Sequence, residues 1–146
     1  MNTIKLAIAL TLVFAVNAYA GPKEEYILDK INPAWQRLDS ISQSYLTDEQ
    51  QKTIQELAFA TAAGDICAGF DVDKDKFVGA FKIFDNKKLE AMSPDDQRLL
   101  ERKLLVLYGI ATGLFSAEGL LAKEEFCLAA EAARQKPKGN YWKTKE

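Results

Sequence analysis

The fold of this chain is decided by residues 93–110, which read SPDDQRLLERKLLVLYGI. The first four supply an N-cap serine, a proline at the first helical position and two aspartates in the first turn. From Leu104 to Tyr108 the segment is apolar nearly all round, and such a helix is normally covered on every side. We therefore expect a long helix in the middle of a bundle, interrupted at Gly113 or at residues 116–119.

Helical signals also precede this segment. Thr47 and Gln50 form a capping-box pattern, which predicts a helix that begins there and runs to about Gly69. Asn32 followed by Pro33 predicts the start of an earlier helix, with a shorter one before it. Because strand signals are nearly absent, the chain is expected to be all-α: a compact bundle of about five helices around one core.

The first 20 residues have the features of a secretory signal peptide. A lysine precedes an apolar stretch at residues 6–16, and Ala18 and Ala20 place small side chains before a cleavage point after Ala20. A membrane anchor is the weaker alternative, because this stretch is short for a hydrocarbon core about 30 Å thick. We expect a single domain at residues 21–146, exported to the bacterial periplasm or, as a second choice, to the extracellular space.

Export bears on the two cysteines of the chain, Cys67 and Cys127. In an oxidising compartment, an even pair in a small domain favours a disulfide over a redox site, and no C-x-x-C spacing is present. This bridge is expected to link the second major helix to the last one, which begins at about Leu120.

The amino-acid composition excludes several kinds of catalytic and metal-binding site. The chain has 146 residues, 48% of them hydrophobic, and no histidine. The absence of histidine removes the usual Ser–His and Cys–His catalytic arrangements and the commonest zinc sites. The sequence has no glycine-rich loop of the kind that binds phosphate groups, so no cofactor is expected. Carboxylates are plentiful, so a hydrolase that uses two of them stays a distant hypothesis.

An aspartate-rich stretch partly matches a calcium-binding loop. Asp71, Asp73 and Asp75 occupy the first, third and fifth positions of an EF-hand pattern. The sixth position needs glycine but holds Lys76, and the twelfth needs glutamate but holds Lys82. The favoured interpretation is a helix N-terminus capped by Asp73 or Asp75, with calcium as the weak alternative.

Four phenylalanines form the next candidate: Phe70, Phe77, Phe81 and Phe84. The last three are spaced as one stripe of a helix at about residues 74–84. They could line an interhelical pocket for a small apolar ligand. Packing in the core is the favoured interpretation, because aromatic residues at helical spacing usually fill the interior.

The C-terminal tail, at about residues 136–146, interleaves basic and aromatic residues. The candidate partner-binding residues in and just before it are Arg134, Lys136, Lys138, Tyr141, Trp142 and Lys143. This pattern fits an anionic membrane surface, whereas export argues against nucleic acid. The favoured interpretation is a solvated terminus with Tyr141 and Trp142 packed back on the body.

These observations favour a non-enzymatic binding protein of the bacterial envelope that acts on another protein, as an inhibitor, a chaperone or an adaptor. The alternatives are a carrier of a small apolar ligand in a phenylalanine-lined pocket and, third, the carboxylate hydrolase. A protein binder is expected to expose an apolar patch, and a carrier is expected to contain a cavity of about 300 Å³ or more.

Overall fold

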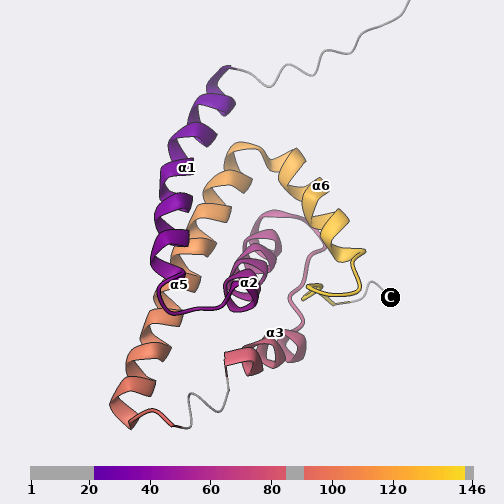
Figure 1. Ribbon diagram of the computed structural model, residues 1–146. Coiled ribbons are helices and arrows are strands. Elements are labelled where there is room, and N and C mark those ends of the chain that lie inside the picture. The colour runs from indigo at the N-terminus through magenta and orange to yellow at the C-terminus, as the bar shows by residue number, and fades with distance from the viewer. Residues whose placement is uncertain (1–21, 85–90, 144–146) are drawn as a thin grey trace, which may run out of the picture.

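The structure is a computed structural model that describes residues 22–84 and 91–143, with side-chain surroundings from residue 31 onward. The expected signal peptide at residues 1–20 lies outside the described residues. The elements are α1 (Pro22–Ser42), α2 (Asp48–Ile66), α3 (Lys74–Ala80), the 3-10 helix η1 (Phe81–Phe84), α5 (Pro94–Leu121) and α6 (Lys123–Arg134) (Figure 1). The predicted all-α bundle of about five helices is confirmed.

The central element of the bundle is α2, and the expectation that the helix beginning at residue 94 would be covered on all sides is wrong. Helix α2 packs mainly against α5 and also against α6. Leu57, Ala58, Ala60, Ala62 and Ala63 are all fully buried. Because alanine side chains are short, neighbouring elements can approach α2 closely on more than one side.

The buried side chains form two clusters, with α2 contributing to both. The first joins α1, α2, η1 and α5 and contains Leu38, Leu46, Ile54, Ala58, Phe84, Leu104, Leu107 and Ala111. The second joins α2, α6 and the C-terminal segment and contains Ala60, Ala62, Ala63, Cys67, Phe70, Phe126, Ala130 and Trp142.

Helix α1 is continuous over 21 residues, so the helix start predicted at Asn32 and Pro33 is wrong. Proline inside a helix removes one backbone hydrogen bond and crowds the preceding turn. Packing against α5 offsets this cost. The Trp35 and Phe115 rings contact each other at a tilt of 60° with centroids 4.7 Å apart, and Trp35 Nε1 donates to the Glu118 carboxylate.

Helix α5 runs without interruption for 28 residues, so the predicted break at Gly113 or residues 116–119 is also wrong. An exposed glycine costs a helix only about 1 kcal/mol relative to alanine. Burial of Leu104, Leu107 and Ala111 against α1 and α2 outweighs that cost. The start of the helix is as predicted, since the Ser93 hydroxyl accepts from the Asp96 amide.

The disulfide between Cys67 and Cys127 is present and links the end of α2 to α6, as predicted. The two Cα atoms are 5.6 Å apart, within the usual range for a bridge. Cys67 follows α2 directly, and Gly69 then takes a positive φ of 76° that turns the chain away.

Residues 139–143, here called the C-terminal strap, cross the segment that precedes α3. Val72 and Trp142 form an isolated antiparallel bridge. The Asp73 amide donates to the Tyr141 carbonyl, and the Lys143 amide donates to the Asp71 carbonyl, both at 2.8 Å. The strap thereby closes the second cluster around Trp142.

Candidate functional site

One face of α5 leaves apolar side chains in solvent. Leu105, Val106 and Ile110 are 65%, 60% and 44% exposed, and Gly109 and Gly113 lie among them. We call these five residues the outer α5 face. The helical repeat places them on the side away from Leu104, Leu107 and Ala111, which fill the first core cluster.

No described element covers the outer α5 face. A Cβ atom added at Gly109 or Gly113 would meet no described neighbour within 4 Å outside the helix's own backbone. By length and composition alone α5 could span a membrane, and 22% of its most apolar stretch is buried inside the described structure. Adjacent exposed apolar side chains of this kind are typical of interaction surfaces.

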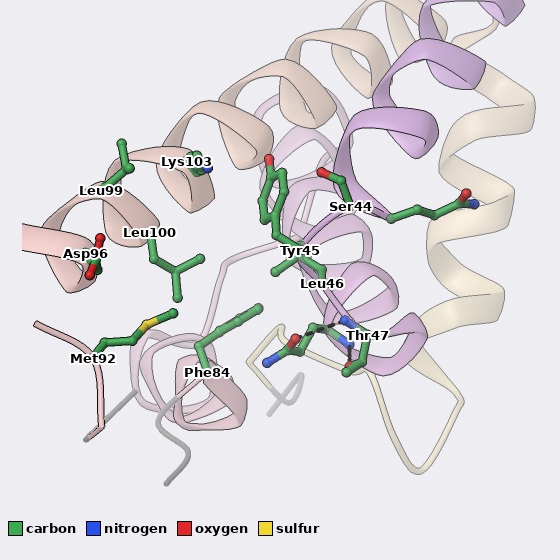
Figure 2. A pocket seen from close by; sticks show the side chains of 12 residues that line it. Ser44, Tyr45, Leu46, Thr47, Phe84, Met92, Asp96, Leu99, Leu100 and Lys103 are labelled. Atoms are coloured by element: carbon green, nitrogen blue, oxygen red, sulfur yellow. Dashed lines mark hydrogen bonds between the residues drawn. The ribbon is translucent and has the colours of Figure 1, made fainter. Parts of the chain in front are cut away.

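A groove lies beside this face, between the α1–α2 turn, η1 and the first turns of α5 (Figure 2). Its volume is about 570 Å³, within the range of small-molecule sites. Phe84, Met92 and Leu100 converge on it from different elements in Figure 2. The described residues that line it are Gln43, Ser44, Tyr45, Leu46, Thr47, Gln50, Phe84, Met92, Asp96, Leu99, Leu100 and Lys103.

Seven of the twelve described lining residues of the groove have polar side chains, and several of these are engaged by other protein groups. Lys103 Nζ lies 5.0 Å from the centroid of the Tyr45 ring, and burial raises the pKa of the Tyr45 hydroxyl. The Gln50 side chain accepts from the Thr47 amide at 3.0 Å and donates to a carbonyl of η1. Asp96 is the only carboxylate among the described lining residues, whereas a glycosidase-like mechanism needs a facing pair.

The four phenylalanines do not surround one cavity. Phe84 lines the groove, while Phe77 and Phe81 contact each other with centroids 5.7 Å apart. Phe70 belongs to the second cluster and meets Trp142 edge-on at 5.2 Å. This distribution agrees with the packing interpretation of the phenylalanine pattern.

Of the three aspartates, Asp73 caps the start of α3. The Asp73 carboxylate accepts from the amides of Asp75 and Lys76, as an N-cap does, and its other oxygen lies 3.7 Å from Lys76 Nζ. Asp71 contributes its carbonyl to the C-terminal strap. Within the described ranges, no group of three or more His, Cys, Asp or Glu residues is placed to hold a metal ion.

The structure separates the tail residues into two groups. Arg134 and Trp142 are buried: the guanidinium lies 3.5 Å from the centroid of the Phe70 ring, and Trp142 Nε1 donates to the Ala60 carbonyl at 3.0 Å. Arg134 Nη2 also donates to the Gly69 carbonyl at 2.9 Å. The exposed members are Lys136, Lys138 and Lys143. A membrane or protein that met this tail would therefore meet lysines.

Tyr141 is half-buried beside α2. Its hydroxyl donates to Glu56 Oε2 at 3.5 Å. Burial, followed by the negative charge of Glu56 and this hydrogen bond, raises the pKa of Tyr141. The aromatic part of the tail thus belongs to the folded body.

Sequence reasoning missed the outer α5 face, because it interpreted an apolar segment as a fully covered helix. The signal that could have found it is the pair Gly109 and Gly113 within that segment. A helix covered on all sides gains from filling each position, and two glycines four residues apart leave one side empty.

Comparisons with known proteins add no assignment. No protein-family model, curated protein or solved structure shows significant similarity to this chain.

Proposed function

We propose that this chain is an exported, non-enzymatic binding protein of the bacterial cell envelope, and that it acts through protein contact on the outer α5 face. The single observation that carries the proposal is the exposure of Leu105, Val106 and Ile110 next to two open glycines. Leaving these side chains in water costs free energy in proportion to their area, and a docked partner removes that cost.

The proposed compartment follows from the leader and the disulfide. A bridge between Cys67 and Cys127 is compatible with an oxidising compartment. The test is the intact mass of the chain recovered from the periplasm or the medium. We expect it to lack residues 1–20, and recovery of uncleaved chain from the cytoplasm would contradict export.

The contact surface is tested by site-specific photo-crosslinking. A photoreactive amino acid at Val106 is compared with one at Val78, a valine of similar exposure on α3 (67% against 60%). We expect a protein adduct from position 106 and none from position 78. Equal adducts at both positions, or none at either, would contradict the assignment of this face.

A second candidate function is the carriage of a small apolar ligand, and the groove of about 570 Å³ favours it. Leu100→Trp would fill part of this groove. If the groove holds a ligand, native mass spectrometry of the purified chain shows a bound small molecule that is reduced in this variant. Ligand-free spectra for both proteins would reject the carrier.

A further inference from the structure

We infer that the groove beside α5 binds an amphipathic carboxylate, a small molecule with one carboxylate group on an apolar chain, and that Lys103 pairs with this group. The inference rests on the second candidate function, because it names the class of ligand that the groove carries. It does not depend on protein contact at the outer α5 face, since Leu105, Val106 and Ile110 are not among the described residues that line the groove.

The most deeply buried lining residues of the groove are apolar. Leu46 and Phe84 are 8% and 5% exposed, and Met92 and Leu100 are half-buried. In Figure 2 the side chains of Phe84, Met92 and Leu100 point toward one another. An apolar chain laid against these side chains is removed from water, and that removal is the usual source of affinity in such sites.

One edge of the groove presents two hydrogen-bond donors, and neither has an acceptor among the described residues. Lys103 Nζ lies 5.0 Å from the centroid of the Tyr45 ring and forms no ion pair with any described residue. Figure 2 shows the Tyr45 hydroxyl at the same outer edge, away from Phe84 and Met92. Burial raises the pKa of this hydroxyl, so at neutral pH it is protonated and able to donate. A carboxylate bound at this edge therefore lies next to one positive charge and a second donor.

The charges that line the groove favour the Lys103 edge for a carboxylate. Asp96 is the other charged residue among the described lining residues, and it lies about 10 Å earlier along the axis of α5. Its carboxylate accepts from the Ser93 hydroxyl at 2.7 Å and lies at the helix N-terminus, where the dipole stabilises a negative charge. The Asp96 carboxylate is thus already compensated, whereas the Lys103 ammonium has no counter-ion in the described structure.

The charged residues nearby that do not line the groove leave this difference in place. Asp95 and Arg98 form an ion pair with each other. Glu101 is followed directly by Arg102, so these two charges oppose each other in sign. The two acidic residues in the first turn of α2 are stabilised there by the helix dipole. Of the two charges that line the described groove, the Lys103 ammonium is therefore the one that a ligand can pair with.

Isothermal titration calorimetry of the exported chain with decanoate tests this pairing. We expect a dissociation constant of about 100 µM, and weaker binding of decanol, which has the same chain without the charge. Lys103→Gln should weaken decanoate binding about fivefold, and Lys103→Arg, which keeps the charge, by less than about twofold. The matched control Arg102→Gln removes the same charge from the neighbouring exposed residue, which does not line the groove, and should leave decanoate binding unchanged. Equal weakening by Lys103→Gln and Arg102→Gln would overturn the inference.

A second pair of variants tests whether decanoate lies in the groove. Leu100→Trp fills part of the groove and should weaken decanoate binding at least about tenfold. The control Leu128→Trp places the same side chain on α6, where Leu128 is 71% exposed and does not line the groove, and should leave binding unchanged. Circular dichroism of both variants checks that the helical fold is kept. If Leu100→Trp unfolds the chain, the exposed Lys103 variants still decide the result. Equal binding to both tryptophan variants would place the ligand elsewhere and overturn the inference.

Failure of this inference can be distinguished from failure of the second candidate function. If decanol, or the cationic probe decylamine, binds as tightly as decanoate and Leu100→Trp blocks it, the carrier stands and the carboxylate class is wrong. If none of the three probes binds, the inference falls, and ligand-free native mass spectra decide against the carrier as well. A preference for decanoate that depends on both Lys103 and Leu100 supports the inference and the carrier together.

Discussion

At the scale of single residues, Arg134 has a structural role that its position in a basic tail does not suggest. Its guanidinium stacks on Phe70 and donates to the carbonyl of Gly69, while the Arg134 carbonyl accepts from Asn140 Nδ2 at 2.7 Å. Nε and Nη1 are buried without a hydrogen-bond partner in the described structure. The Arg134 side chain therefore joins α6 to the turn after α2, and its backbone carbonyl joins α6 to the C-terminal strap.

Removal of this side chain is expected to destabilise the fold. Arg134→Ala loses the cation–π contact, a charge-assisted hydrogen bond and the ion pair between Nη1 and the Glu131 carboxylate at 3.8 Å. We expect the free energy of unfolding in urea to fall by about 2 kcal/mol. The control Lys136→Ala, at an exposed position, should change it by less than about 0.5 kcal/mol. Equal effects of the two variants would show that the contacts of the Arg134 side chain add no stability.

Tyr141 should make stability depend on pH in the alkaline range. Burial and the neighbouring Glu56 carboxylate raise the pKa of the Tyr141 hydroxyl in the folded state above its ordinary value, so folding favours the protonated form. The corresponding stabilisation is complete below pH 10 and is lost as the pH rises through the folded-state pKa. Urea titrations between pH 8 and 11, about the ordinary tyrosine pKa, should show a shallower loss for Tyr141→Phe than for the parent chain. Parallel losses would contradict this assignment.

At the scale of the element, α5 has two unlike sides on one helix. Its inner side packs against α1 and α2, and its outer side is the exposed face described above. Gly119 lies on a packed side: an added Cβ would come within 2.7 Å of Ile66 Cδ1 and 2.9 Å of the Phe126 ring. A larger side chain therefore fits at Gly109 and Gly113 but clashes at Gly119.

Alanine substitutions at these glycines should have opposite effects. Gly109→Ala and Gly113→Ala enter open space and should each raise the free energy of unfolding by about 1 kcal/mol, since alanine favours the helix. Gly119→Ala should lower it by about 1 kcal/mol, because the clash outweighs the same gain in propensity. Urea denaturation gives all three values. A stabilised Gly119→Ala would show that Ile66 and Phe126 can move aside.

At the scale of the whole molecule, two apolar clusters share α2, and the disulfide ties the second one together. The bridge between Cys67 and Cys127 closes a covalent loop, because the two residues are 60 positions apart in the sequence. The C-terminal strap adds a second closure, with Trp142 only 1% exposed between α2 and the segment that precedes α3. The disulfide therefore fixes α6 to the end of α2, and the C-terminal strap fixes the chain after α6 to the segment that precedes α3.

Reduction of the disulfide should lower the melting temperature by roughly 15 °C. Loop closure of this length reduces the entropy of the unfolded chain by an amount worth about 4 kcal/mol, which corresponds to a shift of that order in a small domain. Calorimetry with and without reductant measures it, with free thiols counted to confirm reduction. An unchanged melting curve at confirmed thiol release would show that the bridge adds no stability.

Local signals predicted the starts of helices better than their continuity. The capping box at Thr47 and the Ser93 cap form as expected, because each depends on side chains within three residues of the helix start. Pro33 was expected to mark a helix start, and Gly113 or residues 116–119 an interruption, and neither expectation holds. The local costs of proline and glycine, about one to a few kcal/mol, are smaller than the gain from packing long helices against each other.

Local sequence signals also predicted only part of the candidate site. Asp73 caps α3 as the favoured interpretation had it. Of the three phenylalanines spaced as one stripe, Phe84 is buried in the first cluster, whereas Phe77 and Phe81 are only partly buried. The exposed face of α5 could not be predicted from the apolar pattern, because a pattern records which side chains are apolar and not which neighbour covers them.

The sequence by itself determined the helical class, the capped starts of α2 and α5 and the pairing of Cys67 with Cys127. These depend on short-range hydrogen bonding, on apolar periodicity and on there being only two cysteines in the chain. The tertiary structure alone decided that α2 rather than α5 is the covered helix, that Arg134 is interior, and that Leu105, Val106 and Ile110 face solvent. The reason is that burial is a property of pairs of elements, set by how α1, α2 and α6 share the surface of α5, and no local stretch of sequence contains that information.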